Sequence, residues 1–169
     1  DKLIVEELVD PLMHVVRNAL DHGIETEAER VAARKPEEGL IFIEATQRGN
    51  HVVIQVRDDG RGIDSERVRK KAEARGLVAP GQTLTYKETL DLIFAPGLST
   101  RDEVTETSGR GVGMDVVRAN VTALGGVVDI DSVLGHGTTI TMTLPITLAI
   151  IQALLVGVAN QRYAIPLNS

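Results

Sequence analysis

Turns that contain glycine divide this chain into short segments, and no other feature of the sequence limits the possible folds so strongly. Residues 40–46 and 52–57 alternate between apolar and polar side chains on either side of one such turn, which predicts an antiparallel hairpin. Residues 127–133 and 138–144 form a second pair of strands around another glycine-containing turn. Segments of helical periodicity separate the two pairs, so the sequence predicts an α+β domain.

Five segments carry helical periodicity. The first begins at Asp10, where the Asp can cap free N–H groups and the following Pro tolerates the first helical position, and Gly23 provides a stop. Thr26 opens the second with the pattern of a capping box. Residues 95–113 carry glycines and few apolar anchors, which predicts a mobile loop. The predicted helices span residues 10–22, 26–35, 65–75, 86–94 and 114–124.

Composition narrows the class of protein. The 169 residues, 43% of them hydrophobic, are enough for one buried core. A formal charge of −6 argues against a general DNA or RNA binder, which needs a basic face, but a locally basic pocket can still hold a nucleotide. The chain has no cysteine, which excludes disulfides, thiolate metal sites and a cysteine nucleophile.

Pro145 marks a predicted domain boundary, with the α+β pattern in residues 1–145. From residue 146 a different, β-rich unit begins, with predicted strands at 148–158 and 162–167. The chain does not open with the pattern of a signal peptide, and its longest apolar run is too short to span a bilayer. We therefore expect a cytoplasmic location and no insertion into a membrane.

The stretch HVVRNALDHGIE, residues 14–25, carries the first chemical motif. Residues four apart share one face of a helix, so the polar side chains fall into adjacent rows while the opposite side stays apolar. One face can therefore join a core while the other presents donors and acceptors to a common space. The same pattern also suits a solvated face with incidental histidines. The two rows are His14, Asn18 and His22, and Arg17 with Asp21.

A second motif, RDDGRGI, covers residues 57–63 at the predicted end of a strand. The Asp58 carboxylate can accept a hydrogen bond from an exocyclic amine, and the glycines allow a planar base to approach the backbone. A plain acidic turn explains the same residues, because Asp-Gly is common in turns.

Two further glycine motifs stand at residues 108–114 and 135–139. In the first, SGRGVGM, spaced glycines at a helix entry let N–H groups point at a phosphate, although a flexible hinge has the same composition. It follows a loop rather than a strand, which argues against a dinucleotide-binding βαβ unit. The second, GHGTT, also fits a simple hairpin turn.

Taken in order, these motifs resemble the N box, first glycine box, F box, second glycine box and closing Gly-Thr segment of the GHKL ATP-binding superfamily. Residues 14–25, 95–100 and 108–117 look like the matching segments of the chemotaxis histidine kinase family CheA. His14 stands where many membrane sensor kinases carry Glu, as it does in CheA. The tail after Pro145 looks like the start of the CheW-like regulatory domain of that family.

The resemblance implies a two-layer α/β sandwich, with a mixed, mostly antiparallel sheet and helices on one face. It also implies that ATP and Mg²⁺ bind, with Asn18 as metal ligand, Asp58 as acceptor of the adenine amino group and Gly62 allowing the base to approach. Residues 109–114 would close over the phosphates as a lid. The other ATP-binding residues that it implies are Arg17, Asp21, His22, Ile63, Arg67, Lys71, Ser99, Thr100, Gly109, Arg110, Gly111, Val112, Gly113, Met114 and Thr138.

The implied reaction is transfer of the γ-phosphoryl group of ATP to a histidine on a separate phosphotransfer domain, with His14 activating or orienting the acceptor imidazole. Further implied partners are a CheW-like adaptor and chemoreceptor array, through the regulatory domain, and indirectly a response regulator. Two alternatives remain at this point. One is a GHKL ATPase that uses ATP closure mechanically with water as acceptor, and the other is a nucleotide-binding scaffold without turnover.

Overall fold

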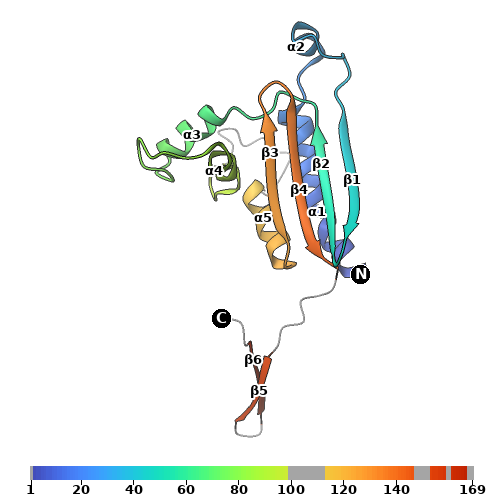
Figure 1. Cartoon of the computed structure of the whole chain (residues 1–169), viewed down its shortest axis with the longest axis vertical. Helices are drawn as coiled ribbons and strands as arrows, with labels where there is room; N and C mark the ends of the chain where they lie inside the picture. The colour runs from blue at the N-terminus through green and yellow to red at the C-terminus, as the bar shows by residue number, and fades with distance from the viewer. Residues whose placement is uncertain (1, 99–112, 147–152, 159–160, 167–169) are drawn as a thin grey trace, which may run out of the picture.

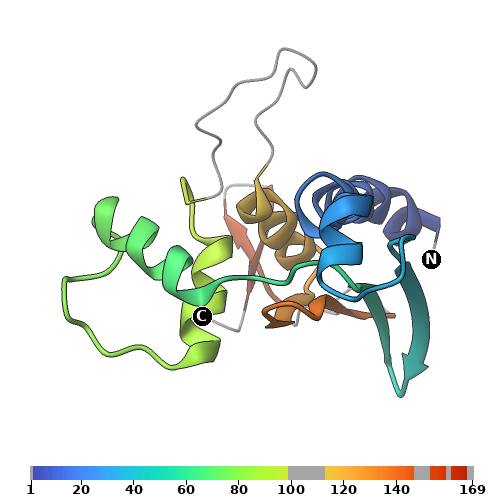
Figure 2. The ribbon, with the colours of Figure 1, turned by 90° about the horizontal axis from the view of Figure 1, so that it is seen from above.

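The computed structural model describes residues 2–98, 113–146, 153–158 and 161–166. Its central feature is an antiparallel four-stranded sheet in the order β1-β2-β4-β3. Two helices, α1 (Lys2–Asn18) and α5 (Met114–Ala123), lie side by side across one face of that sheet (Figures 1 and 2), which confirms the predicted α+β sandwich. The strands are β1 (Ile41–Arg48), β2 (His51–Asp58), β3 (Val127–Val133) and β4 (Gly137–Pro145).

The helices follow the predicted order. A π turn, η1, directly follows α1, and a 3-10 turn, η2, directly follows α4. Capping boxes begin α2 at Thr26 and α4 at Thr85, since in both a threonine hydroxyl and a glutamate three residues later satisfy each other's backbone N–H groups. The bounds are α1 (Lys2–Asn18), η1 (Ala19–Gly23), α2 (Glu27–Ala32), α3 (Ser65–Ala74), α4 (Tyr86–Asp91), η2 (Leu92–Phe94) and α5 (Met114–Ala123).

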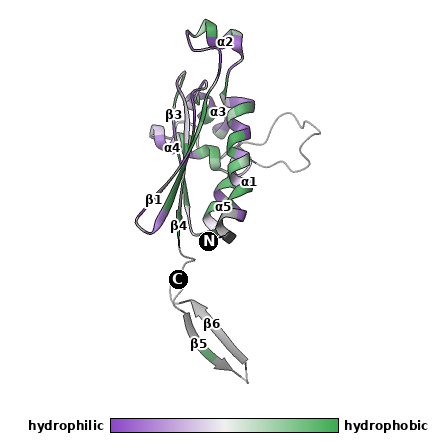
Figure 3. Cartoon of the chain, turned by 90° about the vertical axis from the view of Figure 1, so that its right-hand side faces the viewer, coloured by the Kyte–Doolittle hydropathy of each residue, from purple (hydrophilic) through white to green (hydrophobic). Residues whose placement is uncertain are grey.

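Because of the alternation along the strands, one set of side chains forms the core, and one carboxylate is buried among them. Ile54 and Val56 of β2 are buried and pair with Met142 and Ile140 of β4, on the face that α1 and α5 cover. Because side chains alternate between the two faces, the next residue in this series on β2 is Asp58, which is also buried. Figure 3 shows the sheet from its side, with α1 and α5 on the covered face.

The first helix differs from its predicted start. Instead of beginning at Asp10, α1 runs from Lys2 to Asn18 with Pro11 inside it. A proline within a helix removes one hydrogen bond and costs roughly 3 kcal/mol. Pro11 is buried, as are Leu8 and Val15 on the same helix, so packing against the core offsets the lost bond.

The end of this helix also differs from the prediction, which continued the α-helix to residue 22. Regular α-helical bonding stops at Asn18, and Ala19–Gly23 forms a π turn in which Ile24 N donates to Ala19 O at 2.8 Å. A π turn holds more residues per turn than an α-helix, so residues four apart no longer stack. His22 therefore does not continue the row of His14 and Asn18.

The free edge of β3 is covered by side chains from α4. Tyr86 Oη donates to Ser132 O at 2.5 Å, and Lys87 Nζ donates to Ile130 O at 2.8 Å. These two carbonyls, two residues apart, point away from β4 and would otherwise be open to another strand. The helix thus covers part of this edge of the sheet.

The remaining strands, β5 (Ala153–Val158) and β6 (Gln161–Pro166), form a separate antiparallel pair. They fall within the predicted second unit, although the first starts later than residue 148. The predicted loop at 95–113 is described only as far as Leu98 and again at Gly113, and residues 99–112 lie outside the described residues. Among the described residues, no helix has the length and apolar character needed to cross a membrane.

Candidate functional site

Asp58, at the end of β2, is the centre of the site. Its side chain is buried, and Oδ1 accepts hydrogen bonds from Gly60 N at 2.9 Å and Thr138 N at 3.3 Å. Burial raises the pKa of the Asp58 carboxyl above its usual value, although these two N–H groups oppose the shift. Oδ2 receives no hydrogen bond from the described residues, so it can accept one from a bound molecule.

Two glycines allow three segments to meet around this carboxylate. A Cβ at Gly60 would lie 2.1 Å from Gly23 O, at the end of η1. A Cβ at Gly62 would lie 2.2 Å from the O of Val133, the last residue of β3, and Gly62 also has a φ of +67°. These glycines were predicted to let a base approach the backbone. In the structure, the backbone of neighbouring segments lies in the space beside them. They allow η1 and the β3–β4 turn to pack against residues 59–62, the turn that follows Asp58 and is called the Asp58 turn below.

Ser132 links two predicted site residues and was not itself predicted. Its Oγ accepts from Ile63 N at 2.9 Å, donates to Gly137 O at 3.0 Å and lies 3.0 Å from Thr138 Oγ1. Ser132 is buried on β3. Ile63 and Thr138, far apart in the chain, are thus held on the same side of Asp58. Only the alternation along β3 hinted at an inward-facing hydroxyl here.

Asn18 brings the end of α1 to the start of α5. Its Nδ2 donates to Met114 Sδ at 3.0 Å, and both Met114 and the preceding Gly113 are buried. The predicted N box and the last residue of the second glycine box are therefore in contact. The amide oxygen of Asn18 has no hydrogen bond to the described residues and remains available as a ligand.

An amide oxygen is a suitable ligand for Mg²⁺, which prefers oxygen and usually keeps waters or phosphates in its shell. No cluster of three or more His, Asp or Glu side chains suited to a metal occurs in the part of the chain that is described. Asn18 thus fits a metal that takes most of its ligands from phosphate and water, and does not fit a metal held by protein alone.

The other predicted residues differ in their exposure. His14 lies on α1 one turn before Asn18 and is half-buried, with its Nε2 atom enclosed. Arg17, Asp21 and His22 are exposed. On α3, Arg67 is exposed and Lys71 is half-buried, and neither side chain makes a hydrogen bond or ion pair with the described residues.

Six predicted residues cannot be placed. They are Ser99, Thr100, Gly109, Arg110, Gly111 and Val112, which lie outside the described residues.

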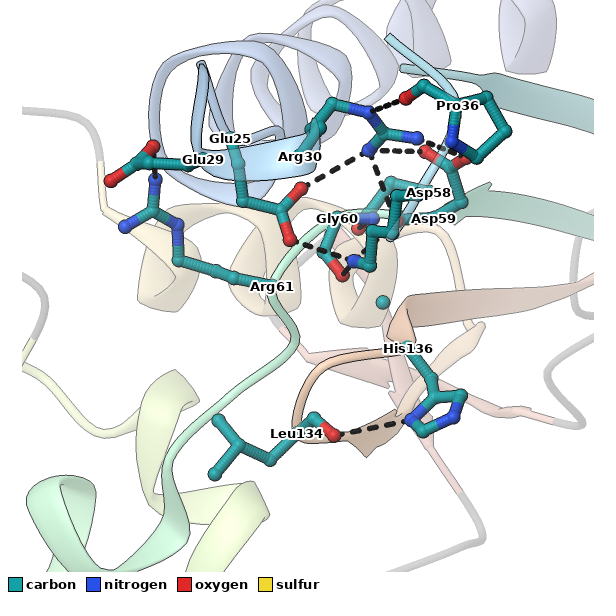
Figure 4. A network of polar contacts seen from close by, with 12 residues as sticks. Glu25, Glu29, Arg30, Pro36, Asp58, Asp59, Gly60, Arg61, Leu134 and His136 are labelled. Carbon is teal, nitrogen blue, oxygen red and sulfur yellow. Dashed lines mark hydrogen bonds and ion pairs between the residues drawn. The ribbon is translucent and has the colours of Figure 1, made fainter. Parts of the chain in front are cut away.

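A charged network next to Asp58 was missed by the sequence analysis (Figure 4). Arg30 of α2 is fully buried; its Nη2 lies 2.8 Å from Asp59 Oδ2 and its Nη1 lies 3.1 Å from Glu25 Oε2. Lys35 Nζ lies 2.7 Å from Glu25 Oε1. Burial alone would raise the pKa of Asp59, but the Leu40 N–H and Arg30 outweigh it and hold that pKa below its usual value. The network ties α2 to the turn after β2.

A family model described as "Histidine kinase-, DNA gyrase B-, and HSP90-like ATPase" matches residues 7–148. The chain belongs to this ATPase family. The matched residues correspond to the ATP-binding domain of this family.

Relatives within this ATPase family match the whole chain. It is 50% identical to the "Sensor histidine kinase CheAY" of Helicobacter pylori and covers 21% of that protein. It is 50% identical to a "Chemotaxis protein CheA" of Treponema pallidum, of which it covers 21%, and 47% identical to that of Salmonella typhimurium, of which it covers 25%. In each case all of this chain is aligned, so it spans about a quarter or less of these relatives.

Proposed function

We propose that this chain is the ATP-binding catalytic domain of a chemotaxis-type histidine kinase, which transfers the γ-phosphoryl group of ATP to a histidine on a separate phosphotransfer domain. One observation carries the proposal. The segment from Asn18 to Gly23 adjoins both the Asp58 turn, through Arg61 N and Gly23 O at 2.8 Å, and the start of α5, through Met114. A purine site and a triphosphate site can therefore share one nucleotide.

The adenine end is assigned to Asp58, with Ile63 and Thr138 beside it. Oδ2 of Asp58 accepts the exocyclic amine, while Oδ1 stays bonded to Gly60 N and Thr138 N. Guanine carries a carbonyl at the position of this amine, so it would place an acceptor against the Asp58 carboxylate. The site should accordingly prefer adenine over guanine.

The phosphate end is assigned to Asn18, Gly113 and Met114, together with the glycine-rich residues that precede Gly113. Mg²⁺, when bound, neutralises charge on the phosphates. Asn18 holds it with its amide oxygen, and Arg17, Asp21 and His22 line the sugar and phosphates. Arg67 and Lys71 of α3 supply cations for the phosphates, since neither is neutralised by a described side chain.

His14 is assigned to orienting the acceptor imidazole of the phosphotransfer domain. The bond from the γ-phosphorus to its bridging oxygen breaks as the bond to the imidazole nitrogen forms, and ADP leaves. A neutral imidazole needs little deprotonation, so positioning is the larger part of this role. His14 is half-buried on the same helix as Asn18, one turn away, which supports a place beside the γ-phosphate.

The domain division and the wider partners belong to the same proposal. Residues 1–145 form the ATP-binding domain, and residues 146–169 begin a CheW-like regulatory domain. Through that domain the whole protein would join a CheW-like adaptor and a chemoreceptor array in the cytoplasm, and it would act on a response regulator indirectly. Support comes from the full-length alignment of this chain with proteins named CheA.

The test is incubation with ATP labelled in the γ-phosphate and a purified phosphotransfer domain. Label on that domain that is lost in acid and kept in base indicates phosphohistidine and supports the kinase. Release of phosphate without label on the domain would support a mechanical ATPase instead. Tight ATP binding with neither result would support a scaffold. A phosphotransfer domain whose acceptor histidine is replaced by glutamine is the control for unspecific labelling.

A further inference from the structure

Lys35 makes three contacts with its ammonium group, all close to the Asp58 turn. Its Nζ lies 2.7 Å from Glu25 Oε1, 2.9 Å from Asp59 O and 2.7 Å from Gly60 O. An ammonium group has three donors, so each can be used by one of these oxygens. Lys35 does not contact the Asp58 carboxylate itself.

The two carbonyls belong to successive peptide units whose N–H groups complete the site. The unit that carries Asp59 O also carries Gly60 N, which donates to Asp58 Oδ1 at 2.9 Å. The unit that carries Gly60 O also carries Arg61 N, which donates to Gly23 O at 2.8 Å. Because a peptide unit is planar, fixing the oxygen at one side fixes the direction of the N–H at the other.

The lysine is itself held in place by the buried network. Arg30 binds the other oxygen of Glu25 at 3.1 Å, both carboxylate oxygens of Asp59, and Pro36 O at 2.7 Å. Figure 4 shows Glu25, Arg30 and Asp59 converging next to Pro36 and Gly60. The carboxylate of Glu25 is therefore fixed by Arg30, and it in turn holds Lys35 beside the Asp58 turn.

The positive charge of Lys35 supports the same role as its hydrogen bonds to the Asp59 and Gly60 carbonyls. A cation at a peptide oxygen polarises the unit and strengthens its N–H as a donor. The Gly60 N–H is the closer of the two backbone donors to Asp58 Oδ1. Lys35 thus acts on the carboxylate through one rigid peptide unit rather than by contact.

We propose that Lys35 is a positioning residue for purine specificity: by holding the Asp59 and Gly60 carbonyls, it aims the Asp58 carboxylate at the exocyclic amine of the bound purine. The inference rests on the proposed binding of ATP at Asp58. It adds a determinant of adenine recognition that lies 23 positions before Asp58 (58 − 35) in the sequence. The turn between α2 and β1 becomes part of the nucleotide site without touching the nucleotide.

The test compares two ligands on Lys35→Met and on the unchanged chain. The ligands are ATP and purine riboside triphosphate, which carries hydrogen in place of the amino group. Both are titrated against a fluorescent nucleotide on the same preparation, so a partly unfolded fraction cancels in the ratio of dissociation constants. We expect the unchanged chain to prefer ATP by about tenfold or more, and Lys35→Met to lose most of that preference through weaker ATP binding alone.

Lys70→Met is the matched control, because Lys70 is an exposed lysine on α3 without a contact to the network. It should keep the preference of the unchanged chain. Lys35→Arg retains a cation and several donors and should recover part of the preference. If Lys35→Met does not fold, Lys35→Gln is compared in the same way.

Three outcomes overturn the inference, and they are distinguishable. If the unchanged chain binds both ligands equally, the adenine assignment of the proposed function fails and this inference fails with it. If the unchanged chain prefers ATP and Lys35→Met keeps the preference, only the role of Lys35 is wrong. If Lys35→Met weakens both ligands by the same factor, Lys35 supports the fold and does not set specificity.

Discussion

Asp58 and Asp59 are adjacent in the chain, yet the pKa values of their carboxyl groups are displaced in opposite directions. Burial dominates at Asp58 and raises its pKa. At Asp59 the Leu40 N–H and Arg30 outweigh burial and lower its pKa. One carboxylate is therefore kept at a cost to the fold, while the other stabilises the fold.

Asp58→Asn should stabilise the fold and damage adenine recognition together. Ionised Asp58 is unfavourable in the folded chain, and the cost disappears only as the pH falls through its raised pKa. Removing the charge should raise the free energy of unfolding at pH 7 by about 1 kcal/mol. In place of Oδ2, the asparagine presents an N–H₂ donor to the adenine amine, so the preference for ATP over GTP should fall. Denaturant unfolding and paired ATP and GTP titrations measure the two effects; a variant with unchanged selectivity would contradict the adenine assignment.

Asp59→Asn should have the opposite effect on stability. The lowered pKa of Asp59 means that its contribution is present above the ordinary value of a free Asp and is lost as the pH falls through the folded-state pKa. The variant leaves Arg30 buried beside a neutral amide, so its unfolding midpoint at pH 7 should fall by several degrees. As the pH falls below the ordinary pKa of a free Asp, the difference from the unchanged chain should shrink. Thermal unfolding across pH tests this, with the exposed Glu37→Gln as control; a constant difference at every pH would count against it.

Asn18→Asp should impair use of Mg²⁺-ATP while leaving the fold intact. The carboxylate loses the donor that meets Met114 Sδ and adds a negative charge next to the phosphates. We expect phosphotransfer to fall by about tenfold or more, with a changed dependence on Mg²⁺ concentration. Asn120→Asp, an exposed position on α5, is the matched control. Full activity in Asn18→Asp would remove the metal assignment.

Ser132→Ala should weaken the contacts that hold Ile63 and Thr138 at the proposed adenine end. The change removes the acceptor for Ile63 N and the hydroxyl that bridges Gly137 O and Thr138 Oγ1. Leaving such groups without partners in a buried place should lower the free energy of unfolding by about 1–3 kcal/mol. Denaturant titration measures this, and the ATP affinity should fall in the same variant. Equal stability of variant and parent would show that water replaces the hydroxyl without loss.

Much of the fold follows from local pattern in the sequence. Alternation and a short turn were enough for the β1–β2 hairpin, and the capping box at Thr26 was visible as a Thr–Glu spacing. The start of α1 was wrong, because burial of Pro11 in the core decides that helix and no local pattern reports it. The π turn after Asn18 was missed for a related reason. A single turn with one extra residue leaves the spacing of the apolar residues in the sequence unchanged.

The residues of the site also divide into those that a local sequence pattern reveals and those that it does not. Asp58 could be singled out because strand alternation and the glycines after it are local features. Arg30 of α2 and Lys35, which follows this helix, could not, because their long side chains reach a turn more than twenty positions later. Their partners, Glu25 and Asp59, look like ordinary surface charges in the sequence. Only the packing of α2 against the turn makes them a unit.

The contacts that Tyr86 and Lys87 make with the outer carbonyls of β3 have a consequence for assembly. Within the described residues, the four-stranded sheet has β1 and β3 as its edge strands, and on β3 the carbonyls of Ile130 and Ser132 are already bonded to α4 side chains. A strand added to the sheet would meet more free backbone acceptors along β1 than along β3. The short helix α4 therefore disfavours the addition of a strand at β3, next to Ser132 and the proposed adenine end.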